Sequence, residues 1–291
     1  MPFITIFTPT YNRKNTLDRL YNSLCSQTYK DFEWLIIDDG SKDGTQEQIK
    51  EWMTESNLNI TYYYQENSGK HLAYNHALSK AKGLYFFCVD SDDWLPHNSI
   101  KIIWEILSRD IPNDIIGVIG QKAFPDGTLL SPIFPNSISS CNTYELAELY
   151  GCKGEWSIIF ETKKAIAYPF PIVENESFAG ESIIYDLISK SYDFFLDNHV
   201  LTTCEYQQGG LSRNIRQIMM KNPGGYKIYY GNRIDMATRR KERLGYILRY
   251  WIFSFLYGKN DYPYQGKHLN CVNFMRPLGF CAYLLFKYKF S

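Results

Sequence analysis

Residues 84–93 read LYFFCVDSDD, an apolar run that ends abruptly in three carboxylates within four positions. A short apolar run bounded by polar turn residues predicts a buried strand. Two earlier runs, at 4–8 and 32–38, have the same form, and each is followed by a polar cluster, TPTYNR (8–13) or DDGS (38–41). Helical patterns separate the runs. The sequence therefore predicts an α/β fold, a mostly parallel sheet with helices on both faces.

The same alternation continues along the chain. It predicts helices at 16–28, 70–82 and 181–191, and strands at 60–65, 115–119, 156–161 and 194–205. After Gly209 and Gly210, the apolar residues from Leu244 to Phe255 repeat with helical period and predict an amphipathic helix. We therefore divide the chain into a first domain, residues 1–212, and a helical, basic and aromatic C-terminal extension, residues 213–291.

Composition narrows the class of protein. The 291 residues are 45% apolar and 21% charged, as in folded chains and unlike disordered ones. The uncharged stretches near the end are shorter than the roughly 20 apolar residues that a membrane-spanning helix needs. The beginning reads as a strand rather than a signal peptide, so we expect a cytoplasmic protein. The seven cysteines form no C-x-x-C pair, which favours buried thiols over a zinc cage or a disulfide framework.

Charge is unevenly distributed. The net charge is zero, but residues 1–210 carry 16 Lys and Arg against 28 Asp and Glu, whereas residues 211–291 carry 15 against 3. The first part is therefore strongly acidic and the last part strongly basic. Such an asymmetry predicts two regions with different partners.

The three polar clusters follow strands, and ligands of parallel sheets bind at the carboxyl ends of strands. Each cluster alone is typical of a turn or a capped helix start. Together they favour a binding site. The carboxylates at 90, 92 and 93 repel one another unless a cation neutralises them. Oxygen ligands suit Mg²⁺ or Mn²⁺, whose remaining positions water and substrate phosphates can fill.

The motifs TPTYNR, DDGSKDGT, NSGKHLAYN and VDSDD, in this order and spacing, resemble a family 2 glycosyltransferase with the Rossmann-like GT-A fold. The resemblance is strong over residues 3–110 and looser to about 212. It implies an inverting, metal-dependent transferase of the hexosyl or N-acetylhexosaminyl type. The donor would be a nucleoside diphosphate sugar, with a UDP-sugar favoured, and the acceptor a hydroxyl of a glycan or lipid-linked saccharide in bacterial surface polysaccharide synthesis. Residues 1–110 would form the nucleotide-binding half and 111–212 the acceptor half.

The resemblance also implies roles for individual residues. The nucleotide pocket would comprise Thr8, Pro9, Tyr11, Arg13, Asp39, Lys70, Asp90 and Ser91. Tyr11 would stack on the base and Asp39 would accept a hydrogen bond from uracil. Asp90 would lie beside the ribose and, with Asp92, would hold Mn²⁺ or Mg²⁺. Asp93 would either face the acceptor or support the residues that contact the ligands.

The diphosphate lacks its usual basic partner in this sequence. Many family members have Arg just before the residue that is Asn75 here, but this chain has Tyr74. Lys70 is the expected substitute, at a helix start whose backbone N–H groups favour phosphate. Arg213, in the segment GGLSR, would approach the phosphates when that segment closes. His71 is either a part of this site or an ordinary polar residue at a helix start.

Inverting transfer needs a general base for the acceptor hydroxyl. In the family, this base lies at a helix start about 80 to 100 residues after the acidic motif, commonly within a Glu-Asp pair. The resemblance implies this position, whereas the need for a proton acceptor such as a carboxylate follows from the chemistry. Glu181 occupies that place, with Ser182 where the second acid is expected. Glu181 is the expected base and Asp186 the alternative. The other alternative is that Glu181 merely complements the helix dipole.

Other interpretations remain open. Loss of the second acid favours a noncatalytic nucleotide-sugar-binding protein of the same fold. A sugar-phosphate nucleotidyltransferase would need a glycine-rich first loop, which TPTYNR lacks. The helix at 244–255 would either lie on an anionic membrane, placing the protein peripherally on the inner face of the plasma membrane, or pack on the first domain. No motif indicates nucleic-acid binding. His199 is expected to be a packed polar residue more readily than a metal ligand.

Overall fold

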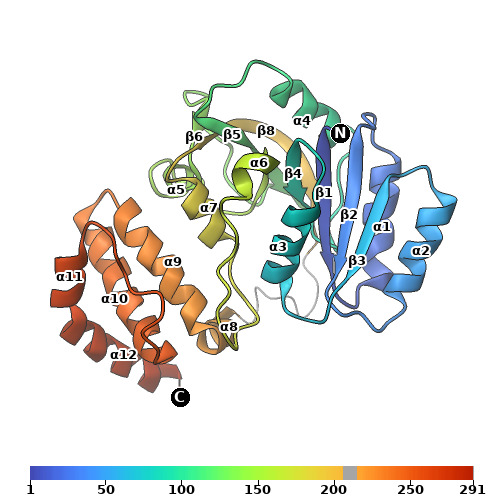
Figure 1. Cartoon of the computed structure of the whole chain (residues 1–291). Coiled ribbons are helices and arrows are strands. Elements are labelled where there is room, and N and C mark those ends of the chain that lie inside the picture. Colours follow the sequence, from blue (N-terminus) through green and yellow to red (C-terminus); the bar gives the residue numbers. More distant parts are fainter. Residues whose placement is uncertain (206–214, 291) are drawn as a thin grey trace. The chain divides into compact units, whose positions relative to one another are not determined.

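The computed structural model describes residues 1–205 and 215–290, which form two compact units (Figure 1). The first unit contains residues 1–169 and 191–205, and the second contains residues 170–190 and 215–290. The expected boundary at residue 212 lies outside the described residues. The segment 170–190, which the sequence analysis assigns to the first domain, belongs to the helical second unit.

The first unit is built on one eight-stranded sheet. Its strands are β1 (Ile4–Thr10), β2 (Phe32–Asp38), β3 (Ile60–Tyr64), β4 (Tyr85–Cys88), β5 (Ile115–Ala123), β6 (Ser140–Cys141), β7 (Trp156–Glu161) and β8 (Asp193–Thr203). They lie in the order β3-β2-β1-β4-β7-β5-β8-β6. The first four strands of this order are parallel, β7 is antiparallel to both its neighbours, β8 is parallel to β5, and β6 is an antiparallel edge. The predicted α/β fold is confirmed.

Helices cover both faces of the sheet. The helices of this unit are α1 (Lys14–Cys25), α2 (Thr45–Glu55), α3 (Lys70–Lys80), α4 (Ser99–Leu107), α5 (Thr143–Glu148) and α6 (Thr162–Ala165). Apolar residues of α1, α2 and α4 pack in one core with Ile4, Ile6 and Trp34 of the sheet. Helix α3 covers the opposite face (Figure 1), and its Tyr74 packs edge-on against Phe7 of β1. Successive residues of β1 therefore face different helices, as the period of two in a strand requires.

The second unit is helical. Its helices are α7 (Ser182–Ile188), α8 (Ile215–Lys221), α9 (Pro223–Met236), α10 (Arg240–Tyr257), α11 (Leu269–Phe274) and α12 (Arg276–Phe290). Ile234 of α9 and Ile247 and Tyr250 of α10 form its core with Val272 and Met275. Among the described helices, none combines the length and apolar character needed to cross a bilayer.

Two expectations need correction. No disulfide is found among the described cysteines, but Cys25, Cys271 and Cys281 are exposed, so the expectation of buried thiols is wrong for these three. Within the region 123–180, which shows only a turn, one strand and a break in the sequence, the structure contains β6, α5 and α6. These elements have two to six residues and are too short for a periodic pattern to reveal.

Candidate functional site

The loops after β1 and β2 are joined to each other at the carboxyl edge of the sheet. Asn12 adopts a positive φ of 52°, which asparagine tolerates better than most residues. Its backbone N–H donates to the hydroxyl of Ser41 at 2.8 Å, and its side-chain oxygen accepts from the N–H of Lys42 at 2.8 Å. The two loops therefore form one structured rim beside Tyr11, whose ring is half exposed.

Asp39 organises the approach to α3. One carboxylate oxygen of Asp39 accepts hydrogen bonds from the side chain of Gln65 at 2.8 Å and from the N–H of Ser68 at 2.9 Å. The other accepts from the N–H of Gly69 at 2.8 Å. A carboxylate has about four lone-pair positions, so a further donor can still be accommodated. The neighbouring Asp38 is fully buried and accepts from the hydroxyl of Tyr62 at 2.9 Å, which is a structural role.

Each carboxylate of the acidic segment 90–93 contacts a cation from a different element of the first unit. The ammonium group of Lys70, at the start of α3, lies 2.6 Å from Asp90. The guanidinium of Arg13, after β1, lies 3.8 Å from Asp92. The ammonium group of Lys122, on β5, lies 3.1 Å from Asp93. The repulsion expected from the sequence is therefore offset one carboxylate at a time.

The three pairs differ in burial. The side chains of Lys122 and Asp93 are 13% and 8% exposed, whereas those of Lys70 and Asp90 are 31% and 37% exposed. Burial alone would raise the pKa of Asp90, but the charges of Lys70, Lys122 and Arg13 outweigh it and hold that pKa below its usual value. Burial raises the pKa of Asp93 to about 7, a rise that Lys122 opposes and the charge of Asp90 increases. Asp90 is thus held as a carboxylate at the surface.

The donor set fits a hard divalent cation. Asp90 and Asp92 present carboxylate oxygens from partly exposed side chains, and the contact between Arg13 and Asp92 is the longest of the three. Oxygen ligands of this kind suit Mg²⁺ and Mn²⁺. Asp93 is a poor ligand for the same ion, because it is buried against Lys122.

The remaining nucleotide-pocket residues divide by burial. Thr8 is fully buried, and its hydroxyl accepts a hydrogen bond from the indole of Trp34 at 3.0 Å, so its side chain serves the core. Pro9 and Ser91 are also buried. Tyr74, where many relatives are expected to have Arg, is a core residue of α3.

The two histidines have unlike surroundings. His71 is buried, and desolvation lowers its pKa. His199 is exposed rather than packed and lies 2.7 Å from Asp197 on its own strand. The expectation that His199 is a packed residue is therefore wrong.

The predicted base and its alternative lie in the second unit. Glu181 is partly exposed and directly precedes α7, whose first turn hydrogen-bonds to its carbonyl oxygen. Asp186 is 1% exposed and accepts from Nε of Arg233 in α9 at 2.6 Å. Arg213 lies outside the described residues.

The segment before α7 is fixed to the start of α9. The carboxylate of Glu176 accepts hydrogen bonds from the N–H groups of Gly224 and Gly225. The side-chain oxygen of Asn222 accepts from the N–H groups of Ser177 and Phe178, both at 3.0 Å. The start of α9 therefore holds the residues that lead to Glu181.

Sequence reasoning missed several residues of these networks. Lys122 carried a signal, because a lysine three residues after the apolar run 115–119 is largely shielded from water on the same strand and needs an acidic partner. Arg19 donates to the carbonyl of Asp92 at 3.2 Å and lies over the ring of Trp94, but its sequence position on α1 gives no such indication. Glu176 likewise has no motif around it.

The fold and the acidic strand-end segment define an α/β protein of the GT-A type. The chain belongs to glycosyl transferase family 2, whose family model matches residues 5–156.

Curated relatives match shorter parts of the chain. The glycosyltransferase GlyA of Streptococcus pneumoniae is 37% identical over 102 residues, which cover 35% of this chain and 14% of that protein. The chondroitin synthase of Pasteurella multocida is 31% identical over 131 residues, covering 45% of this chain and 14% of that protein. The match thus spans a small part of the length of these relatives.

Two solved structures share the fold. Residues 1–349 of TarS from S. aureus, in complex with UDP, align with a TM-score of 0.58 and 16% identity, covering 97% of this chain and 89% of that one. The mannosyltransferase PcManGT from Pyrobaculum calidifontis, in complex with GDP-Man and Mn²⁺, aligns with a TM-score of 0.55 and 15% identity, covering 96% and 81%.

Proposed function

We propose that this protein is a metal-dependent inverting glycosyltransferase that moves a sugar from a UDP-sugar to a hydroxyl of a glycan or lipid-linked saccharide in bacterial surface polysaccharide synthesis. It would act in the cytoplasm, at the inner face of the plasma membrane. The observation that carries the proposal is the acidic segment 90–93, with two partly exposed carboxylates beside the rim of Tyr11 and Asp39. Complexes of TarS with UDP and UDP-GlcNAc support the donor class, and the Mn²⁺ complex of PcManGT supports a metal.

The residues of the first unit would bind and orient the donor. The half-exposed ring of Tyr11 would stack on the uracil base of the donor, while Asp39 would accept a hydrogen bond from the N–H of that uracil. Asp90 and Asp92 would hold Mn²⁺ or Mg²⁺, and the chemistry such an ion would supply there is neutralisation of negative charge on a diphosphate. Lys70 and Arg13 already lie beside these carboxylates, so both cations are placed to contact phosphate oxygens once a donor is bound.

Glu181 would act as the general base. Its carboxylate would take the proton of the acceptor hydroxyl while that oxygen forms the bond to the anomeric carbon. The bond from this carbon to the diphosphate oxygen breaks on the opposite side, and its electron pair leaves with UDP, so the configuration is inverted. Asp186 is less suited to this role, because a buried carboxylate that already pairs with Arg233 has little capacity to accept a proton. Arg213 would contact the diphosphate, and Asp93 would lie toward the acceptor.

Thermal unfolding with nucleotides tests the donor class. The protein would be heated with UDP or with GDP, each with and without Mn²⁺. A ligand that binds only the folded state stabilises it, by about 2.7 kcal/mol at a concentration one hundred times its Kd. We expect a rise in Tm specific to UDP with Mn²⁺, and loss of the metal-dependent part of that rise in Asp92→Asn. Asp110→Asn, which changes an exposed acid of the same unit, is the matched control.

The result also separates the competing functions. An unchanged Tm with both nucleotides would contradict the proposed donor site. A rise with UDP and Mn²⁺ but no release of UDP from any UDP-sugar, with or without saccharide acceptors, would favour the noncatalytic binding protein. Pyrophosphate formation from UTP and a sugar phosphate would favour the nucleotidyltransferase.

A further inference from the structure

One side of the α11 and α12 region is an exposed apolar stripe. Phe274, Leu278, Leu285 and Tyr288 are 83%, 58%, 71% and 87% exposed, and Cys281 between them is exposed as well. Leu278, Cys281, Leu285 and Tyr288 follow one another at spacings of three, four and three residues, which places these four along one face of a helix. These four residues lie on α12, and Phe274 is the last residue of α11, which the turn residue Met275 separates from α12. We call these five residues the exposed stripe.

The opposite side of α12 is already packed within the second unit. Phe286 contacts Phe253 of α10, with ring centroids 6.0 Å apart. A Cβ added to Gly279 would lie 2.3 Å from Cβ of Trp251, so only glycine permits this close approach of α12 to α10. The helix is thus apolar on two sides and buries one of them. A helix that is apolar all round is normally buried, so the exposed stripe needs an apolar partner.

The charges around the stripe indicate what kind of partner this is. After Asp261 the sequence contains no acidic residue, whereas Lys267, Arg276, Lys287 and Lys289 are all basic. Arg276 begins α12, and both Arg276 and Lys287 are exposed near the two ends of the stripe. Apolar residues flanked by lysine and arginine, with aromatic rings at the ends, are typical of helices that lie in the headgroup region of a bilayer.

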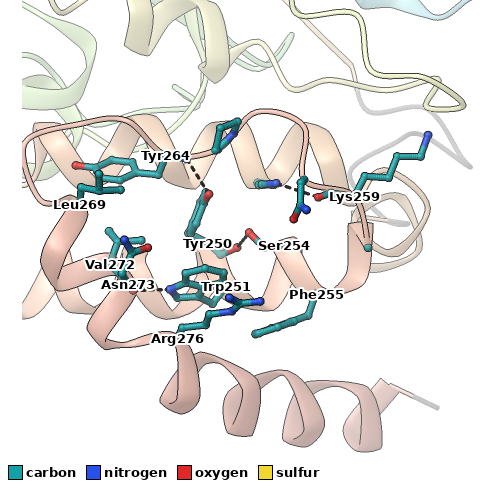
Figure 2. A pocket seen from close by; sticks show the side chains of 14 residues that line it. Tyr250, Trp251, Ser254, Phe255, Lys259, Tyr264, Leu269, Val272, Asn273 and Arg276 are labelled. Atoms are coloured by element: carbon teal, nitrogen blue, oxygen red, sulfur yellow. Dashed lines mark hydrogen bonds between the residues drawn. The ribbon is translucent and has the colours of Figure 1, made fainter.

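A cavity lies between α10, α11 and the first residue of α12, and none of the stripe residues lines it (Figure 2). This cavity, of about 320 Å³, is lined by Trp251, Asn273 and Arg276 among others. The indole of Trp251 donates to the carbonyl of Val272 at 2.7 Å, and the guanidinium of Arg276 lies 5.3 Å from the centre of the same ring. The volume is at the lower end of the range for small-molecule sites. Arg276 is thus exposed at the start of α12 and held beside Trp251 at the edge of this cavity.

We propose that the exposed stripe docks the protein on the surface of an anionic lipid bilayer. A second copy of the chain is the less suitable occupant, because two surfaces from a region with 15 basic and 3 acidic residues would repel each other. The proposal deepens the membrane location in the proposed function but does not depend on its chemistry. It places the membrane contact on α11 and α12 rather than on residues 244–255, for which the sequence left a membrane surface and packing on the first domain both open. In α10, Ile247, Tyr250 and Phe253 are buried in the core of the second unit.

Vesicle co-sedimentation of the full chain tests the proposal. The vesicles would contain phosphatidylcholine alone or phosphatidylcholine with phosphatidylglycerol as the anionic component. We expect binding to the anionic vesicles only, weakened by high salt. The double variant Leu278→Asn, Leu285→Asn should bind at least about tenfold more weakly, since two leucine side chains lose their burial. Ile172→Asn, at another exposed apolar residue of the second unit, should bind as the wild type does.

Each outcome decides for or against the stripe. The proposal is overturned if the double variant binds the vesicles as strongly as the wild type does. It is also overturned if the wild type does not bind, or binds equally with and without phosphatidylglycerol. If light scattering shows that the wild type is a dimer and the double variant a monomer, a second copy of the chain is the occupant instead. The Tm and its response to UDP with Mn²⁺ should be the same in all variants. If the Tm of the wild type does not rise with UDP and Mn²⁺, the proposed function is contradicted, but the vesicle result still stands.

Discussion

Asp186 and Arg233 form a buried ion pair whose disruption should be costly. Their side chains are 1% and 9% exposed, and the distance between the paired atoms is 2.6 Å. The ring of Tyr229 also lies 5.2 Å from the guanidinium carbon. In Asp186→Ala the guanidinium would remain buried without its carboxylate. Breaking such a pair from one side costs about 3–5 kcal/mol, much of it the desolvation of the charge that is left.

Replacing both partners separates the value of the pair from the cost of breaking it. In the double variant Asp186→Leu, Arg233→Met, neither charge is left buried, and apolar side chains of similar length fill the space. We expect this variant to recover most of the stability that Asp186→Ala loses. The matched control is Glu242→Gln, which disrupts the exposed contact between Glu242 and Arg239 and should change stability by less than about 1 kcal/mol.

Two measurements check this reasoning. Urea unfolding gives the free energy of unfolding, and amide hydrogen exchange in α7 and α9 locates any loss in the second unit. Turnover is measured in parallel, because Asp186 was also the alternative base. The double variant should retain turnover. Two results together would refute the structural role and make Asp186 the base. They are a free energy of unfolding for Asp186→Ala within about 1 kcal/mol of the wild type, and a loss of turnover by orders of magnitude in the double variant.

The remaining predictions concern the proposed reaction. Glu181→Gln should lower turnover about 10²- to 10⁴-fold and leave the UDP affinity measured by titration calorimetry unchanged. Its control is Glu174→Gln, which changes an exposed acid of the same unit. Full turnover in Glu181→Gln would show that the base lies elsewhere. Lys70→Met should weaken UDP binding by roughly tenfold or more and UMP binding less, since a charged hydrogen bond to the diphosphate is lost, while Lys50→Met on the surface of α2 should change neither. An equal loss for UDP and UMP would mean that Lys70 does not contact the diphosphate.

The sheet was predictable because its central strands are nearly continuous apolar runs. Such runs mark parallel strands buried on both faces, and β2, for example, is buried at all seven positions. Once these strands are placed side by side, the polar residues that follow them must share an edge, so 8–13, 38–41 and 90–93 could be brought together from the sequence. The pairing of Lys122 with Asp93 could not be foreseen, because it depends on the neighbour relations of β5 and β7.

The helical unit was harder to predict because its helices are not cleanly amphipathic. Helix α9 begins PGGY and includes Gly231, residues of low helix propensity, and α12 is apolar on two sides. Neither gives a single stripe with a polar opposite face. Helix α10 does have such a period, and from the sequence it could lie on a membrane or pack on the first domain. A periodic stripe shows that one side is buried, but it does not distinguish a protein core from a lipid surface.

The three ion pairs of the acidic segment differ in a way that bears on donor binding. Asp93 is buried and the side chain of Lys122 is only 13% exposed, so breaking this pair would leave poorly solvated charges, and we expect it to stay intact throughout the reaction. Lys70 with Asp90 and Arg13 with Asp92 are partly exposed, and their charges can be rehydrated at little cost. In the proposed function a donor diphosphate and its metal would arrive together, the metal at the carboxylates and the phosphates at the two cations. The metal alone would leave the two cations without their carboxylates, and the diphosphate alone would leave the two carboxylates without their cations. We therefore expect UDP and Mn²⁺ to stabilise the protein jointly.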